Sequence, residues 1–127
     1  MPNPGEQRAR FPRAGRLLRH ADFERVYKQG RRHFAARMTV FYLRRAEGGG
    51  ARIGFTVGKV LGAAVERNRI KRRLREAVRL QRRKLDSPVD VVINPKKAIL
   101  QVDFSELGSE ISQAFEAIQK SMRATGA

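Results

Sequence analysis

The sequence predicts one α+β domain in which a helix and three strands precede a long basic helix, and a further strand and helix follow it. Apolar residues recur at helical spacing in three segments, and runs of β-branched and aromatic residues between them predict strands. With 127 residues, of which 41% are hydrophobic, the chain is long enough for one core of modest size.

The first predicted helix lies between Leu17 and Gly30, where Phe23, Val26 and Tyr27 follow helical spacing. Gly30 is expected to end it in the left-handed conformation. Phe23 and Tyr27 lie one turn apart on the same face. From spacing alone, packing in the core is the favoured interpretation of this pair, and an exposed aromatic surface is the alternative.

Three strands are predicted next. A short edge strand covers Arg31–Phe34, and Met38–Arg45 and Arg52–Val57 are rich in β-branched and aromatic residues. A glycine-rich turn at Glu47–Gly50 separates the latter two strands, so we expect them to pair as an antiparallel hairpin. Both faces of this hairpin carry apolar or aromatic groups, so that one face can cover a core and the other can expose rings.

The most basic segment of the chain is also a predicted helix, Glu66–Arg83. Ten of the eighteen residues from Arg67 to Lys84 are lysine or arginine, and Glu76 alone opposes them. An apolar face at helical spacing runs along this segment: Ile70, Leu74, Ala77, Val78 and Leu85. The segment is therefore expected to bury one face and to present its cations on the other.

A compact apolar strand is predicted at Val89–Ile93, which makes a strand–helix–strand crossover around the basic helix. The final helix is predicted to pack on the sheet through residues at helical spacing: Phe104, Leu107, Ile111, Phe115, Ile118 and Met122. Glu106, Glu110 and Glu116 belong to this helix, so the basic surface is expected elsewhere.

The charge of the chain points to a polyanionic partner. Twenty-eight Lys and Arg residues oppose 12 Asp and Glu residues, which gives a formal net charge of +16. Nucleic acid is the expected partner, and an anionic membrane is disfavoured because the apolar face of the basic helix is interrupted. Residues 1–15 are expected to form a disordered basic arm, either as a solvated tail or as a contributor to phosphate binding.

No catalytic or metal site is predicted on the protein. The chain has no cysteine, and His20 and His33 lack the spacing of a metal cluster. Neither paired carboxylates for metal-dependent hydrolysis nor a phosphate-binding glycine loop stands out. No apolar run approaches the roughly 20 residues of a membrane span, and a cytoplasmic protein is expected.

The segment from Val57 to Arg79, VGKVLGAAVERNRIKRRLREAVR, resembles the signature of the bacterial ribonuclease P protein subunit, centred on Arg67-Asn68-Arg69. Other segments fit that family in order and spacing: DFERVYKQG at Asp22–Gly30, VFYL at Val40–Leu43, RIGFTV at Arg52–Val57 and VDVVINP at Val89–Pro95. The resemblance covers residues 16–122, which are expected to form the domain, with a short tail at 123–127.

The resemblance implies a small α/β fold of the α+β type: a two-layer sandwich with αβββαβα topology, similar to that of some ribosomal proteins. It also implies a four-stranded sheet with a left-handed crossover, against the usual right-handed rule. The implied activity is that of a ribonucleoprotein endonuclease that removes 5′ leaders from precursor transfer RNA by Mg²⁺-dependent hydrolysis. In that family the catalytic RNA, present one-to-one with the protein, supplies the catalytic groups and binds most of the Mg²⁺.

The resemblance also implies roles for named residues. The 5′ leader of the precursor would be bound by Phe23, Tyr27, Phe41, Lys71 and Arg75. The catalytic RNA would be contacted by Lys59, Arg67, Asn68, Arg69 and Arg72. These roles reverse the interpretation of Phe23 and Tyr27 as core residues, because exposed rings can stack on single-stranded bases without strong sequence preference. Phe41 stands where many members have tyrosine, which keeps the ring and loses the hydroxyl.

Two alternative functions are compatible with charge and fold. One is a structural RNA-binding protein of a ribosomal type, with no nuclease partner. The other, a stand-alone metal nuclease, would need a cluster of carboxylates that the sequence does not suggest.

Overall fold

The computed structural model of the chain describes residues 16, 19–46 and 49–125. The predicted N-terminal arm and part of the predicted turn at Glu47–Gly50 lie outside the described residues. In chain order the helices and strands are α2 (His20–Gln29), β1 (Arg31–Phe34), β2 (Met38–Arg44), β3 (Arg52–Phe55), α3 (Ala64–Gln81), β4 (Val89–Pro95) and α4 (Phe104–Thr125). Short 3₁₀ helices occur at Lys59–Leu61, Arg82–Lys84 and Lys97–Leu100.

The four strands form one mixed sheet in the order β1-β2-β4-β3. β1 pairs antiparallel with β2, β2 pairs antiparallel with β4, and β4 pairs parallel with β3. The expected hairpin between the second and third strands is therefore wrong, because β4 lies between them. The hairpin is instead formed by β1 and β2, and the short edge strand predicted at Arg31–Phe34 is confirmed.

The composition of β4 explains its central place. Val91 and Ile93 point to one face of the sheet and Val92 to the other, and all three are fully buried. A strand that is apolar on both faces is stable only where both faces are covered. β3, with only four residues, is short and takes the edge.

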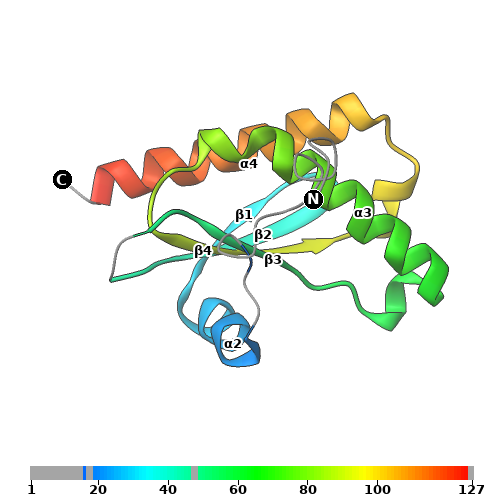
Figure 1. Cartoon of the computed structure of the whole chain (residues 1–127), viewed down its shortest axis with the longest axis horizontal. Coiled ribbons are helices and arrows are strands. Elements are labelled where there is room, and N and C mark those ends of the chain that lie inside the picture. Colours follow the sequence, from blue (N-terminus) through cyan, green and yellow to red (C-terminus); the bar gives the residue numbers. More distant parts are fainter. Residues whose placement is uncertain (1–15, 17–18, 47–48, 126–127) are drawn as a thin grey trace, which may run out of the picture.

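Helices cover both faces of the sheet. α3 and α4 lie side by side on one face, and α2 lies alone on the opposite face (Figure 1). The predicted two-layer sandwich is thus the sheet with α3 and α4, and α2 adds a helix behind it. The main core fills the space between the sheet and α3 and α4, and a smaller apolar cluster centred on Val26 and Val92 lies beneath α2.

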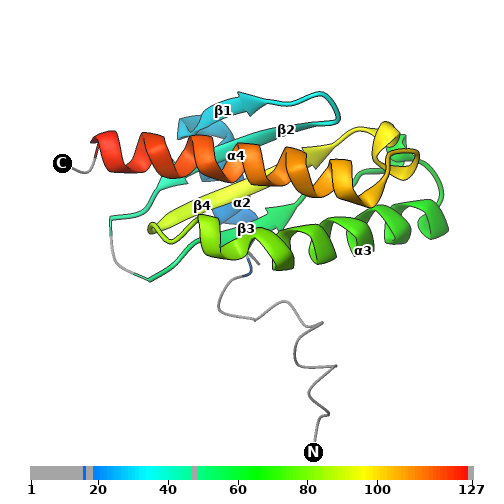
Figure 2. The same cartoon turned by 90° about the horizontal axis from the view of Figure 1, so that it is seen from above.

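The crossover β3–α3–β4 joins neighbouring parallel strands. Figure 2 views the sheet from the side of α3 and α4. When that view is turned so that β3 and β4 point upward, the chain moves leftward from β3 to β4. This is the left-handed connection that the resemblance implied, and it departs from the right-handed rule.

α2 differs in detail from its prediction. Gly30 has φ −79° and ψ 169°, so it is extended rather than left-handed. Glycine is needed there for a steric reason, because a Cβ atom would lie 2.4 Å from the carbonyl oxygen of Val26 and 2.6 Å from that of Tyr42. The end of α2 therefore approaches the β2 backbone too closely for any side chain.

The amphipathic prediction for the basic helix is confirmed. α3 begins two residues earlier than predicted, ends at Gln81 and continues as the 3₁₀ turn Arg82–Lys84. The apolar face is buried: Ile70, Leu74, Ala77 and Val78 have no exposed surface, and Leu85 is 4% exposed. The apolar face of α4 is likewise buried, apart from Phe104 at its first residue.

Candidate nucleic-acid interface

Three of the predicted site residues come together beneath α2. Phe23, Tyr27 and Phe41 are half-buried and pack against the small apolar cluster of Val26 and Val92. The rings of Tyr27 and Phe41 meet in a T-shaped contact, with 4.9 Å between their centroids and an interplanar angle of 83°. These rings are therefore neither wholly core nor wholly exposed: each has one side against the protein and part of its surface open.

Hydrogen bonds fix the orientation of Tyr27. Its hydroxyl donates to Oδ1 of Asn94 at 2.7 Å, and Oγ1 of Thr56 lies 2.6 Å away. A phenol has one proton to donate, so the Thr56 hydroxyl is the donor in the second bond. Asn94 belongs to β4 and Thr56 directly follows β3, so the tyrosine ties α2 to two strands and is held in one position.

Sequence reasoning missed Arg32. Its guanidinium carbon lies 5.2 Å from the centroid of the Phe41 ring, in a cation–π arrangement. The two residues are direct partners in the β1–β2 register, so they project from the same face of the sheet. Strand alternation predicts this pair once β1 and β2 are known to form the hairpin, but the sequence alone indicates Arg31–Phe34 only as an edge strand.

The predicted residues of α3 divide between its two flanks. Winding the helix at roughly 100° per residue places Lys71 and Arg75 on one flank of the apolar face and Arg73 on the other. Nη2 of Arg73 donates to the carbonyl oxygen of Val102 at 2.5 Å, just before α4, so the Arg73 flank faces α4. The flank with Lys71 and Arg75 consequently faces away from α4, on the β3 side of the sheet (Figure 2).

No hydrogen bond, ion pair or ring contact joins Lys71 or Arg75 to the rings beneath α2 within the part of the chain that the structure describes. Of the three rings, only Tyr27 reaches the edge of the sheet below α3. Its hydroxyl contacts Thr56, just after β3, from the α2 face, and α3 lies over β3 on the opposite face (Figure 2). Arg75 is exposed and Lys71 is half-buried.

The residues predicted to contact the catalytic RNA lie just before α3 and within its first nine residues. Four of them are exposed, namely Lys59, Asn68, Arg69 and Arg72, whereas Arg67 is half-buried. The buried Nε of Arg67 has no hydrogen-bond partner among the described residues. Glu66 helps to cap the N-terminus of α3, because its Oε1 accepts a hydrogen bond from the backbone N–H of Ala63 at 3.3 Å.

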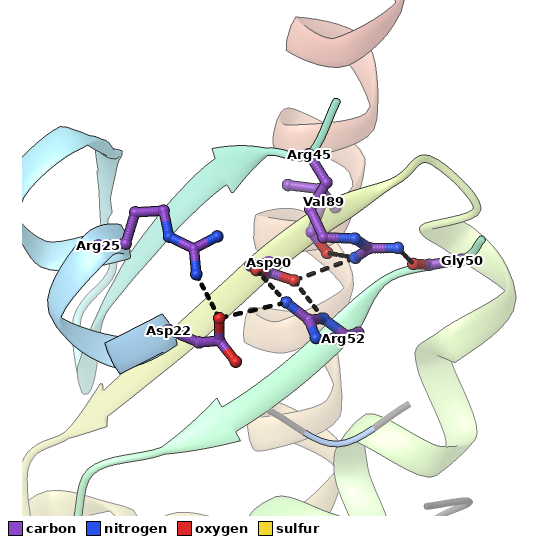
Figure 3. Close-up of polar contacts among 7 residues, drawn as sticks. All are labelled: Asp22, Arg25, Arg45, Gly50, Arg52, Val89 and Asp90. Atoms are coloured by element: carbon purple, nitrogen blue, oxygen red, sulfur yellow. Dashed lines mark hydrogen bonds and ion pairs between the residues drawn. The ribbon is translucent and has the colours of Figure 1, made fainter. Parts of the chain in front are cut away.

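A buried ionic network holds α2 against the sheet (Figure 3). Asp90 on β4 is 1% exposed and accepts two hydrogen bonds from Arg52, from Nε at 2.8 Å and from Nη2 at 2.7 Å. Arg45 donates to the same carboxylate at 3.0 Å. Asp22 of α2 lies 3.7 Å from Arg52 and 2.5 Å from Arg25, which completes the link from sheet to helix.

Several carboxylates near these surfaces are engaged by arginines. Asp90 raises the pKa of Arg52, chiefly through their hydrogen bonds. Glu76 on α3 pairs with Arg79, whose guanidinium lowers the pKa of that carboxyl. Glu110 of α4 pairs with Arg37 at 3.1 Å. In the described part of the chain no group of three or more acidic or histidine side chains is placed to hold a metal ion.

These features define a class of protein: a small, strongly basic α+β domain with a half-buried aromatic cluster between α2 and the sheet and with exposed cations on α3. No helix in the described part of the chain combines the length and apolar character required to cross a membrane.

A family model described as Ribonuclease P matches residues 11–119, and the chain belongs to the family of ribonuclease P protein components. Among its relatives, the ribonuclease P protein component of Citrifermentans bemidjiense is 40% identical over 110 residues, covering 87% of this chain and 93% of that protein. That of Symbiobacterium thermophilum is 39% identical over 104 residues, covering 82% of this chain and 90% of that protein.

Solved structures of the family have the same fold. The ribonuclease P protein of Staphylococcus aureus superposes with a TM-score of 0.73 at 25% identity, covering 84% of this chain and 97% of that one. That of Thermotoga maritima, in complex with 1-(4-fluorophenyl)-2-thiourea, gives 0.71 at 25% identity, covering 80% and 97%. Membership of this family implies a role in transfer-RNA processing within a ribonuclease P holoenzyme, and hence an RNA partner.

Proposed function

We propose that the chain is the RNA-binding subunit that positions precursor transfer RNA on the catalytic RNA of ribonuclease P. The holoenzyme, with one protein per RNA, removes the 5′ leader by Mg²⁺-dependent hydrolysis. The protein binds the catalytic RNA through the start of α3 and the single-stranded leader through the aromatic surface beneath α2. Its effect is to raise substrate affinity and to lower the Mg²⁺ concentration that cleavage requires.

The observation that carries the leader assignment is the half-open aromatic cluster of Phe23, Tyr27 and Phe41. Rings that are fixed on one side and open on the other suit base stacking, which contributes about 1–3 kcal/mol per base and tolerates any sequence. Lys71 and Arg75 add cations on the flank of α3 beside β3, next to which Tyr27 contacts Thr56, and they would neutralise leader phosphates. A subunit that handles many leaders needs this combination.

The catalytic groups are assigned to the RNA. Asp22, Asp90 and Glu76 hold arginines by ion pairs, and Glu66 caps the start of α3, so these carboxylates are poorly suited to activate water or bind a metal. The described residues offer no fitting site for Mg²⁺, and no step of the hydrolysis is assigned to a protein-bound ion. The protein's arginines hold and orient RNA.

Reconstitution with the catalytic RNA of the same organism tests this function. The protein alone, freed of RNA, should not cleave precursor transfer RNA, and addition of the protein to the RNA at low Mg²⁺ should strongly enhance cleavage. The holoenzyme should bind leader-bearing precursor more tightly than mature transfer RNA. Equal affinity for the two would refute the leader assignment, and cleavage by the RNA-free protein would favour a metal nuclease.

Purification of the tagged protein separates the function from the ribosomal alternative. Recovery of one catalytic RNA that supports precursor cleavage is expected. Recovery of ribosomal subunits in its place would contradict the proposal.

A further inference from the structure

One surface of the Phe41 ring is already occupied in the free protein. The Arg32 guanidinium covers one face of the ring at 5.2 Å from its centroid, and the ring also makes the T-shaped contact with Tyr27. A nucleic-acid base can stack only on an open face. Arg32, which is exposed, is therefore the outer member of this pair, and the half-buried Phe41 ring lies beneath it.

We propose that Arg32 is a further leader-binding residue, whose guanidinium plane stacks on one base while its N–H groups donate to the adjoining phosphate. Phe41 then supports Arg32 from below instead of receiving the base directly. The inference rests on the proposed leader-binding function and deepens it by naming a residue and a mode of contact.

The chemistry of arginine suits this role. The guanidinium is planar, stacks on π-systems and carries five N–H donors in a fork that matches a phosphate. The Arg32 side chain makes no hydrogen bond or ion pair with any residue in the described ranges, so these donors are available. Arg25 and Arg52 differ, because they are held by Asp22 and Asp90.

Contact with Phe41 also prepares Arg32 for binding. A long side chain that is fixed on binding costs about 0.5–1.5 kcal/mol of conformational entropy. The cation–π contact holds the guanidinium over the ring before RNA arrives, and this reduces the cost. Tyr27, anchored by Thr56 and Asn94, fixes the ring in turn.

The chain contains a matched control one residue away. Arg31 and Arg32 are consecutive, carry the same charge and are both exposed. In the β1–β2 register Arg31 pairs with Tyr42 and Arg32 pairs with Phe41, so the two arginines project from opposite faces of the sheet. Arg31 lines a hollow with Met122 of α4, away from the rings.

The first test compares Arg32→Ala, Arg32→Lys and Arg31→Ala in the reconstituted holoenzyme. Dissociation constants are measured for precursor transfer RNA with its leader and for mature transfer RNA. Arg32→Ala should weaken precursor binding about tenfold, the loss expected for one stacked base, and leave mature binding unchanged. The precursor affinity of Arg32→Lys should lie between those of the wild type and Arg32→Ala, because lysine keeps the positive charge but lacks the planar guanidinium. Arg31→Ala should change neither constant by more than about twofold.

The second test removes leader bases one at a time by abasic substitution, which keeps the phosphates. At one leader position, the abasic substitution should lower the affinity of the wild-type holoenzyme for the precursor about tenfold. At the same position it should cause no further loss of affinity in the Arg32→Ala holoenzyme. If the losses of affinity from Arg32→Ala and from the abasic substitution add at every leader position, stacking on Arg32 is overturned. It is also overturned if Arg32→Ala and Arg31→Ala weaken precursor binding equally. If the wild-type holoenzyme does not distinguish precursor from mature RNA, the leader-binding function itself fails, and this inference fails with it.

Discussion

At the residue scale, the hydroxyl of Tyr27 links the aromatic surface to the sheet. We predict that Tyr27→Phe lowers the free energy of unfolding by about 1–2 kcal/mol, because it leaves Asn94 and Thr56 without their partner. Urea denaturation measures this change. Tyr42→Phe is the control, because Tyr42 is also half-buried but makes no hydrogen bond through its hydroxyl to any described residue. Equal losses in the two variants would contradict a specific role for the Tyr27 bonds.

Glu76 gives a prediction for pH. Arg79 donates to its carboxylate and lowers its pKa below the usual value of 4.5, so the folded state holds the charged form more strongly than the unfolded chain does. The stabilisation is complete above about pH 4.5 and is lost as the pH falls through the folded pKa. The pair is partly exposed, so its contribution is only a few tenths of a kcal/mol.

Comparison of the wild type with Glu76→Gln by thermal unfolding checks the sign. The stability difference should be present at neutral pH and should vanish at a pH below the folded pKa of Glu76, where both proteins carry a neutral side chain at this position. A difference that grows on acidification would contradict the ion pair as its source.

At the element scale, α3 separates a structural face from a binding flank. Leu74 has no exposed surface, whereas Arg75, the next residue, is exposed. Leu74→Ala should lower the free energy of unfolding by about 2–5 kcal/mol. Arg75→Ala should change it by no more than about 0.5 kcal/mol and should weaken precursor binding, as should Lys71→Ala. Denaturant unfolding and precursor titration, applied to all the variants, separate the two effects.

The ionic network between α2, β3 and β4 should be among the most sensitive contacts of the fold. Asp90→Asn leaves Arg45 and Arg52 facing a neutral amide, and removal of one partner from a buried ion pair costs about 3–5 kcal/mol. Urea denaturation should show this loss. Arg25→Ala is the control, because Arg25 is 45% exposed and should contribute less than about 1 kcal/mol. Similar losses in the free energy of unfolding of the two variants would show that the buried Asp90 contributes no more to stability than the exposed Arg25.

The elements that could be predicted from the sequence are those whose signal is local. Helical spacing was sufficient to locate α3 and its buried residues, because Ile70, Leu74 and Val78 repeat along one face. Strand pairing is a long-range property, and the glycine-rich turn after β2 favoured a hairpin that β4 in fact interrupts. The same wrong pairing hid Arg32, whose position over Phe41 depends on the β1–β2 register.

The candidate site could be predicted only in part for the same reason. The spacing of Phe23 and Tyr27 placed both on one face of α2, but their half-burial depends on Val92 of β4. The roles of Lys71 and Arg75 came from the family resemblance. They remain predictions, since the exposed flank of a basic helix does not itself specify which RNA it meets.

At the scale of the whole molecule, charge is distributed unevenly. Acidic residues of α4 are engaged, with Glu106 and Glu110 pairing with Arg37 and Glu116 pairing with Lys84. The start of α3, by contrast, presents Asn68, Arg69 and Arg72 to solvent. With a net charge of +16, the folded chain repels itself, and binding to a polyanion relieves that repulsion.

Affinity for the catalytic RNA should therefore depend steeply on salt. If about six phosphates are neutralised, the logarithm of the association constant should fall against the logarithm of the salt concentration with a slope near −5. Filter binding or fluorescence titration over a range of KCl concentrations measures this slope.

Replacing both Arg67 and Arg69 with alanine should make the slope shallower by about 2, because each lost contact releases roughly one counterion fewer. The same substitutions in Lys28 and Lys96, which are exposed cations outside both proposed surfaces, should leave it almost unchanged. A nearly flat response in the wild type would contradict phosphate neutralisation as the main source of affinity.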